Sequence, residues 1–138
     1  MATFKTLEEI EAWQQGRELT RQVYEVSGRG SFGRDFALRD QIRRAAVSVM
    51  SNIAEGFGRG GAREFVQFLS VARGSTSEVS AQLYVALDQG YLSADGFARL
   101  QEQVTRTGSV LSGLMRYLRT STVKGSKYRQ TTNGTGER

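Results

Sequence analysis

The chain has 138 residues and a net charge of +5, and it contains no histidine, cysteine or proline. This length is enough for one domain with a single hydrophobic core. The absence of histidine and cysteine excludes thiolate and imidazole metal sites, Ser-His and Cys-His nucleophilic pairs, and disulfides. No apolar run approaches the roughly 20 residues that span a bilayer, and the N-terminus lacks the apolar core of a signal peptide. We therefore expect a cytoplasmic protein with no membrane partner.

The positive charge is concentrated in two segments of the chain. Residues 29–73 carry a net charge of +4 and residues 121–138 carry +3, whereas residues 1–28 carry −2. Sixteen of the 19 cationic residues are arginine, whose planar guanidinium suits phosphate and carboxylate groups. Local basic segments of this kind are typical of nucleic-acid contact, although an arginine-rich composition can equally reflect a GC-rich genome.

The first helix is expected to begin at Thr6, because residues 6–9 read Thr-Leu-Glu-Glu and match a capping box. One face of this helix carries small and apolar residues at helical spacing, namely Ala12, Gly16, Leu19, Val23 and Val26. A second face carries Ile10, Trp13 and Tyr24. Monomers rarely tolerate such an exposed apolar patch, so we predict that these three residues lie at the interface of a homo-oligomer. The glycine-rich residues 28–33 are expected to form a loop.

Three further helices follow from the same periodicity. Residues 36–57 place apolar side chains three or four residues apart, and the glycine-rich residues 56–61 are expected to end this helix. A third helix is expected over residues 62–87, with Gly90 at its C′ position. Ser93 is expected to cap a fourth helix.

Four amphipathic helices joined by short turns predict an all-α fold. The expected architecture is an antiparallel up-down-up-down four-helix bundle over residues 1–120. Residues 121–138 contain almost no apolar residues and are expected to form a disordered basic C-terminal tail.

Two patterns in the sequence are typical of ligand sites, but neither is complete enough to predict one. Residues 56–61 match the G-x-G-x-x-G motif of dinucleotide-binding loops, but that motif needs a preceding strand and here it follows a helix. Bundles can hold di-metal sites, but those sites need histidines that this chain lacks. No residue is an obvious nucleophile or a base that titrates near neutrality. We therefore predict a protein that is not an enzyme and has no catalytic residue, metal or cofactor.

Ser48, Asn52 and Glu55 form a polar line beside the apolar stripe of the second predicted helix. Half-buried polar residues must hydrogen-bond to one another or to a partner. One interpretation is a structural polar seam, in which Glu55 also pairs with Arg59 four residues further on. The other interpretation is a ligand site, and of the two we favour the seam.

The candidate nucleic-acid-binding residues are cations of the two basic segments together with one aromatic residue. They are Arg39, Arg43, Arg44, Arg59 and Arg63 in the first segment, and Lys124, Lys127, Tyr128 and Arg129 in the tail. Arginine and lysine bind phosphates, and a tyrosine between two cations can stack on a base. The alternative is a solvated face with surface ion pairs, in which Asp40 neutralises Arg43 or Arg44.

Residues 41–56, which read QIRRAAVSVMSNIAEG, resemble the signature of a bacterial family. This family comprises the four-helix bundle proteins encoded in intervening sequences of 23S ribosomal RNA genes. Further matches lie at residues 11–14, 64–69, 72–75 and 90–92. The resemblance covers residues 4–119 and excludes the tail. One departure is Met50, where the family usually carries proline, and its amide should leave the second helix straight.

The resemblance implies a left-handed four-helix bundle that assembles as a ring-like homopentamer, with no known enzymatic activity and a role in nucleic-acid binding. The fold is also similar to the accessory variability determinant of diversity-generating retroelements, a basic pentameric bundle that partners a reverse transcriptase and its template RNA. We therefore expect an oligomer that binds RNA or DNA with low specificity. The alternative is an accessory scaffold whose partner is a reverse transcriptase.

Overall fold

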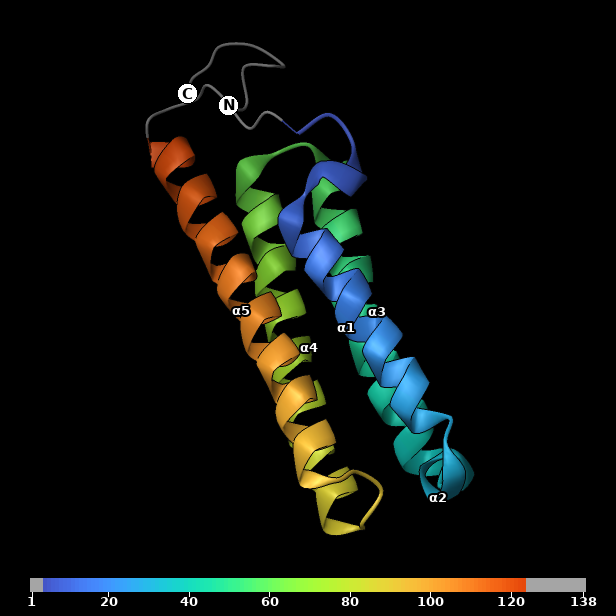
Figure 1. Cartoon of the computed structure of the whole chain (residues 1–138). Coiled ribbons are helices and arrows are strands. Elements are labelled where there is room, and N and C mark those ends of the chain that lie inside the picture. Colours follow the sequence, from blue (N-terminus) through green and yellow to red (C-terminus); the bar gives the residue numbers. More distant parts are fainter. Residues whose placement is uncertain (1–3, 124–138) are drawn as a thin grey trace.

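A computed structural model describes residues 4–123 of the chain. Within this range the chain forms one 3-10 turn and five α-helices. Their bounds are η1 Leu7–Glu9, α1 Glu11–Ser27, α2 Gly30–Arg34, α3 Phe36–Arg59, α4 Ala62–Asp88 and α5 Ala94–Val123. Figure 1 shows that the four long helices lie side by side and that each runs back along the one before it. The predicted all-α four-helix bundle is confirmed.

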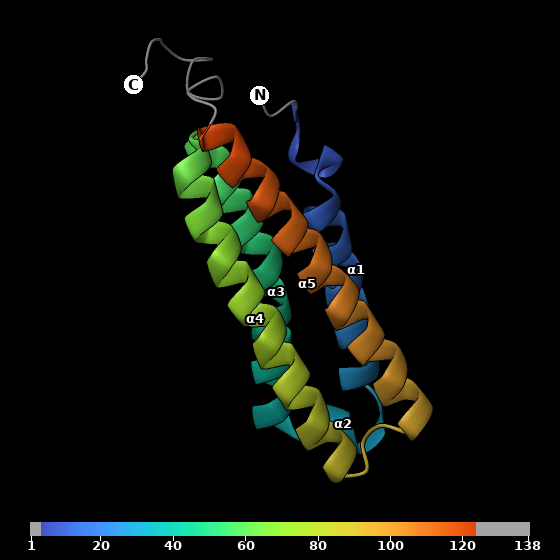
Figure 2. The same ribbon diagram turned by 90° about the vertical axis from the view of Figure 1, so that its left-hand side faces the viewer.

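Each long helix packs against two neighbours. The first, α1, contacts α3 and α5, and α4 contacts the same two helices, so α1 and α4 lie on opposite sides of the bundle (Figure 2). The core has two parts that follow one another along the bundle. One surrounds Leu19, Ile42 and Leu83, and the other surrounds Ile53 and Phe65. Within residues 4–123, every helix is too short or too polar to cross a bilayer.

The start of α1 differs from the prediction. The Thr6 side chain makes no capping hydrogen bond, and the Glu9 carboxylate instead accepts one from the backbone amide of Lys5 at 2.9 Å. After the 3-10 turn the chain is extended at Ile10, and α1 begins at the next residue. Ile10 is fully buried, so this break places its side chain in the core.

The predicted loop at residues 28–33 is wrong, because most of it folds into the short helix α2. Gly30 has a φ of +50°, which lets the chain turn sharply before this helix. Phe32 is buried and stacks on Tyr91 with 5.3 Å between ring centroids. An aromatic anchor of this size outweighs the low helix propensity of the surrounding glycines.

Tyr91 also ties the start of α3 to the connection between α4 and α5. Asp35 caps α3 by accepting a hydrogen bond from the Leu38 amide at 3.1 Å, and its second oxygen accepts one from the Tyr91 hydroxyl at 2.9 Å. This bond to a carboxylate raises the pKa of Tyr91. The contact fixes the end of the bundle at which α2 lies.

The helix α3 is continuous through Met50, as expected, but it does not end at residue 57. It continues to Arg59, and Gly60, with a φ of +86°, then ends it in a left-handed conformation. Residues 56–59 are therefore still helical, and the predicted break is confined to residues 60 and 61. Gly56 is needed for packing, because a Cβ there would lie 2.8 Å from the Cβ of Phe68.

The predicted boundary between α4 and α5 is confirmed. Gly90 has a φ of +78° and donates to the carbonyl of Leu87 at 3.0 Å, and the Tyr91 amide donates to the Ala86 carbonyl at 2.9 Å. These two bonds form a Schellman motif. The Ser93 hydroxyl caps α5 by accepting a hydrogen bond from the Gly96 amide at 3.0 Å.

Candidate nucleic-acid interface

Three of the predicted arginines lie on the first turns of α3, and two of them have partners within the chain. Arg39 donates to Asp40 at 3.1 Å and to the carbonyl of Gly33 at 3.2 Å. Arg43 donates to the Ser27 hydroxyl at 2.8 Å, and its guanidinium lies 4.4 Å from the centre of the Tyr24 ring. Arg44 is exposed and has no hydrogen-bond or ion-pair partner within residues 4–123. Arg44 is therefore the one of the three whose side-chain donors are all uncommitted.

The other two predicted arginines of this segment lie at the far end of the bundle. Between Arg39 and Arg59 the helix α3 rises by about 30 Å, so the two groups do not form one basic patch (Figure 1). Arg59 pairs with Glu55 at 3.0 Å and lies 4.0 Å from Glu64. Arg63 is exposed and has no acceptor among the residues that the structure describes. The basic section expected from the sequence is thus split, and two of its five arginines, Arg39 and Arg59, are already paired with carboxylates.

The four tail residues named above, Lys124, Lys127, Tyr128 and Arg129, lie outside the described residues. The last described residue of α5 is Val123, and α5 ends at the same end of the bundle as the turn between α3 and α4 (Figure 1). The basic sequence therefore begins at the end of the bundle where Arg59 and Arg63 lie.

The polar line of α3 is a hydrogen-bonded seam for two of its three members. The Asn52 amide donates to the carbonyl of Ser48 at 2.9 Å and to its hydroxyl at 3.1 Å, and that hydroxyl lies 2.9 Å from the hydroxyl of Ser75 on α4. Glu55 is exposed rather than half-buried, and it pairs with Arg59 on the surface. Sequence reasoning missed Ser75, because the bond depends on how α3 and α4 are aligned.

The three residues predicted at an oligomer interface occupy different environments. Ile10 is fully buried in the core, so it is not available to a partner and the prediction is wrong for this residue. Trp13 is half-buried, with the Arg17 guanidinium 5.7 Å from its ring centre. Tyr24 keeps 45% of its surface exposed, next to the exposed side chain of Val47 on α3.

A groove between α1 and α5 brings together arginines that no sequence pattern connected. Its volume is about 490 Å³. It is lined by Arg21, Gln22, Glu25, Val26 and Arg29 from the α1 side and by Gly96, Arg99, Leu100, Glu102, Gln103 and Arg106 from α5. Residues 74–120 have no net charge, so charge counting gave no signal for this site. Only the packing of α1 against α5 places the two sets of arginines together.

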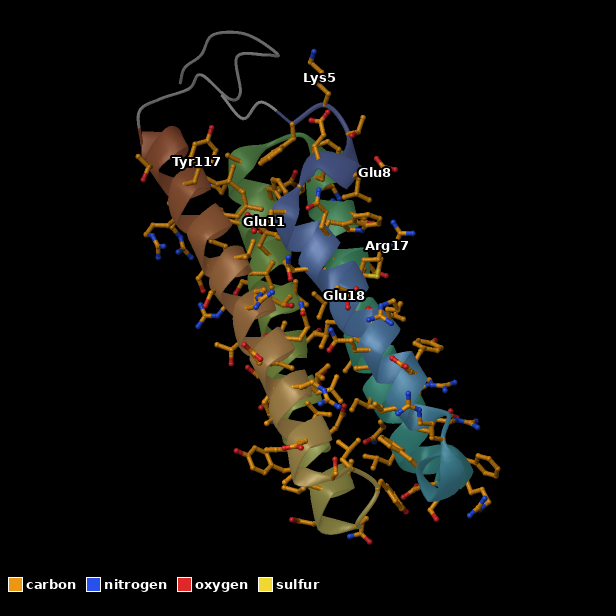
Figure 3. The ribbon with its side chains drawn as sticks, in the orientation of Figure 1. Lys5, Glu8, Glu11, Arg17, Glu18 and Tyr117 are labelled. Carbon is orange, nitrogen blue, oxygen red and sulfur yellow. The ribbon has the colours of Figure 1, made fainter. Side chains whose placement is uncertain are left out.

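Ion pairs order the α1 side of this groove. Arg21 makes two hydrogen bonds to Glu18, at 2.7 and 3.1 Å, and Figure 3 places Glu18 near the middle of α1. Hydrogen bonds from Arg21 and then from Gln22 lower the pKa of Glu18 to about 2. Glu18 is therefore ionised at neutral pH, and it holds the Arg21 guanidinium in one orientation.

A second groove, with a volume of about 630 Å³, lies between the start of α1 and the second half of α5. Its lining is mainly apolar and consists of Phe4, Glu9, Ile10, Glu11, Ala12, Val110, Gly113, Leu114 and Tyr117. Figure 3 shows Glu11 on α1 and Tyr117 on α5. Among the described residues, no group of three or more acidic side chains is placed to hold a metal ion.

Comparison with known proteins identifies the family. No curated protein matches this chain. A crystal structure of a protein of unknown function from the S23 ribosomal protein family of Bacteroides thetaiotaomicron VPI-5482 has the same fold, with a TM-score of 0.68 and 17% sequence identity over 75% of this chain and 97% of that one. The family model of the 23S rRNA-intervening sequence protein matches residues 8–113. Since this match spans most of its length, the chain belongs to the 23S rRNA-intervening sequence protein family.

Proposed function

We propose that this protein is a non-enzymatic oligomeric bundle that binds RNA or DNA with low sequence specificity. The observation that supports this proposal is a set of exposed arginines without a hydrogen-bond or ion-pair partner within residues 4–123. They are Arg44, Arg63, Arg73, Arg99, Arg106, Arg116 and Arg119. Such side chains keep all their donors for phosphate oxygens, and phosphate contacts position a complex without reading bases.

Fluorescence anisotropy tests this function directly. The full chain is titrated against labelled single-stranded RNA, single-stranded DNA and duplex DNA at about 50 mM salt, and then at rising salt. We expect binding to each probe, with little dependence on base sequence and a log-log salt slope of roughly −0.7 to −0.9 per neutralised phosphate. Removing residues 124–138 should weaken binding, because four cations are lost with them. A correctly assembled protein that binds none of the three probes would contradict the proposal.

We further propose that the protein is a homo-oligomer, with the pentamer as the expected state. The supporting observation is a small apolar surface on α1 and α3 formed by Tyr24 and Val47, which are 45% and 39% exposed. The two side chains line one pocket together with the charged side chains of Asp40, Arg43 and Arg44. Phe36, at the start of α3, is 61% exposed. Light scattering coupled to size-exclusion chromatography measures the mass. A monomer at micromolar concentration would refute self-association, and a dimer would refute the pentamer alone.

The apolar groove between α1 and α5 supports a second candidate function, that of a scaffold for a protein partner. By analogy with the retroelement accessory protein, the proposed partner is a reverse transcriptase. A reverse transcriptase gene beside the gene for this chain, and a complex of the two purified proteins that survives nuclease treatment, would support this function. Substituting Leu114 by Asp in the groove should then abolish the complex.

A further inference from the structure

We propose that the groove between α1 and α5 is the channel that binds the phosphate backbone of single-stranded nucleic acid. This inference rests on the proposed function and assigns it to a site. The arginines predicted from the sequence are not gathered in one groove, since Arg39 and Arg43 lie near the start of α3 and Arg59 lies at its end. The remaining two of that set are also apart, because Arg44 lies in the third turn of α3 and Arg63 lies in the first turn of α4.

The α1 side of the groove is an ordered row of alternating charges. Arg21 is held by Glu18 at 2.7 Å and lies 3.5 Å from Glu25, and Arg29 donates to Glu25 at 2.7 Å. Two arginines therefore share one carboxylate, and each keeps further N–H groups for another acceptor. Their orientation is set before a ligand arrives, which lowers the entropy cost of binding.

The α5 side supplies the cations that remain uncommitted. Arg99 and Arg106 are exposed, seven residues apart, and have no acceptor within the described part of the chain. Seven residues correspond to two turns, so both arginines lie on one face of α5 and about 10 Å apart along it. Glu102 lies between them and pairs with neither. A phosphate chain running along α5 would meet both cations.

The floor of the groove excludes most base-specific recognition. Val26 and Leu100 supply its apolar part, and none of the described residues that line it is aromatic. Gln103 is buried, and its amide nitrogen is already bonded to the Gln15 side chain at 2.8 Å. Without an aromatic platform or a free amide fork, binding depends on phosphate contacts and on stacking of bases against guanidinium planes. The site therefore suits a single strand of any sequence.

An acidic peptide is the competing occupant of a groove lined by arginines. We favour nucleic acid because the groove is lined mainly by polar side chains, whereas a peptide helix would need apolar pockets for its anchor residues. The apolar groove further along the same two helices has those pockets but lacks arginine. Binding of polyglutamate to the parent protein therefore tests the acidic-peptide alternative.

The test compares two double variants with the same change in net charge. Arg99→Gln with Arg106→Gln removes the uncommitted cations of the groove, and Arg44→Gln with Arg63→Gln removes two equally unpaired arginines elsewhere. Both variants should keep the parent's melting temperature and mass, because none of the four side chains has a partner within residues 4–123. For single-stranded RNA we expect at least tenfold weaker binding by the groove variant and a salt slope reduced by about 1.4. The control removes the same charge outside the groove, so it should weaken binding only through the overall electrostatic field, by about threefold at most.

The inference also predicts that a different substitution in the groove strengthens RNA binding. Glu102→Gln removes the carboxylate between Arg99 and Arg106 and should strengthen RNA binding, because its repulsion of phosphate is lost. Glu78→Gln, which removes an exposed carboxylate of the groove between α3 and α4, is the control. If Glu102→Gln gains no more affinity than Glu78→Gln, the inference is overturned.

The outcomes separate the inference from the function. Equal losses in the two arginine variants, with binding by the parent intact, would reject the groove and keep nucleic-acid binding. No binding by the parent would reject both. Polyglutamate that binds the parent while RNA does not would assign the groove to an acidic protein partner instead.

Discussion

The seam on α3 shows how burial decides the energetic weight of a polar residue. Asn52 is half-buried and bonded to both the carbonyl and the hydroxyl of Ser48, whereas Glu55 is exposed beside Arg59. Asn52→Ala should destabilise the fold by about 1 kcal/mol, because it removes two part-buried hydrogen bonds to Ser48, whose hydroxyl links the seam to Ser75 on α4. Glu55→Ala should change stability little, since exposed ion pairs contribute little. Thermal melts of the two variants check this, and equal melting temperatures would contradict it.

The glycines at the end of α3 have opposite roles within one helical turn. A Cβ on Gly56 would lie 2.8 Å from Phe68 and 2.9 Å from Phe65, whereas one on Gly58 would meet nothing within 4 Å. Gly56→Ala should therefore cost about 1–3 kcal/mol through overpacking. Gly58→Ala should stabilise the helix by roughly 0.5–1 kcal/mol, because alanine is the better helix former. Denaturant unfolding of the matched pair measures both, and a stabilising Gly56→Ala would show that α4 moves freely.

The roles of some residues depend on local contacts and were predictable from the sequence, whereas the roles of others depend on long-range packing and were not. The roles of Gly90 and Ser93 were foreseen, because both depend on neighbours within a few positions. Ile10 was assigned to an interface because the helix was assumed to run straight through it. The helix is interrupted at Ile10, where the backbone is extended, and this places the side chain in the core. No local sequence pattern predicted the interruption.

At the scale of one element, the charged row on α1 gives the fold a pH dependence. The carboxyl of Glu18 has a folded-state pKa of about 2, below its ordinary value of 4.5. Its contribution to stability is therefore complete above about pH 4.5 and is lost as the pH falls towards 2. Glu18→Gln should melt slightly below the parent at pH 7, and the difference should shrink through this range. Glu78→Gln, which removes an exposed carboxylate without an ion pair within residues 4–123, is the matched control for the change of side chain at pH 7.

The elements themselves were predictable where apolar periodicity was long. The limits of α3 and α4 follow stripes of buried residues, and the first residue of each was foreseen. The short helix α2 was not foreseen, since three glycines in six residues favour a loop. Its stability comes from Phe32, whose stacking partner Tyr91 lies 59 residues further along the chain. A single-sequence pattern cannot contain that contact.

At the scale of the whole molecule, the fold was predictable but the candidate site was not. Periodicity and turn residues specify four helices that pair antiparallel with their neighbours in sequence. The groove proposed to bind nucleic acid is formed by the first and last helices, which are distant in the sequence. The basic patch expected on α3 is divided by the length of that helix. Counting charge along the sequence therefore did not identify this groove, because its arginines come from two helices that meet only in the folded bundle.

Self-association and nucleic-acid binding are coupled if each subunit carries one groove. Several weak phosphate contacts on one assembly act together on a long strand, because the second contact forms at a high effective concentration. The full chain should therefore bind an RNA of about 40 nucleotides at least tenfold more tightly than one of about 10 nucleotides.

A variant that dissociates the oligomer tests this coupling. Val47→Glu places a charge in the apolar surface proposed as the interface, whereas Val71→Glu places the same charge at an exposed valine of α4. Val47→Glu should give a monomer that keeps its affinity for the short strand but loses its preference for the long one, and Val71→Glu should resemble the parent. Anisotropy with the two strands and light scattering of the same samples measure both properties. A monomeric Val47→Glu that still prefers the long strand would place several binding sites on one subunit and remove avidity as the cause.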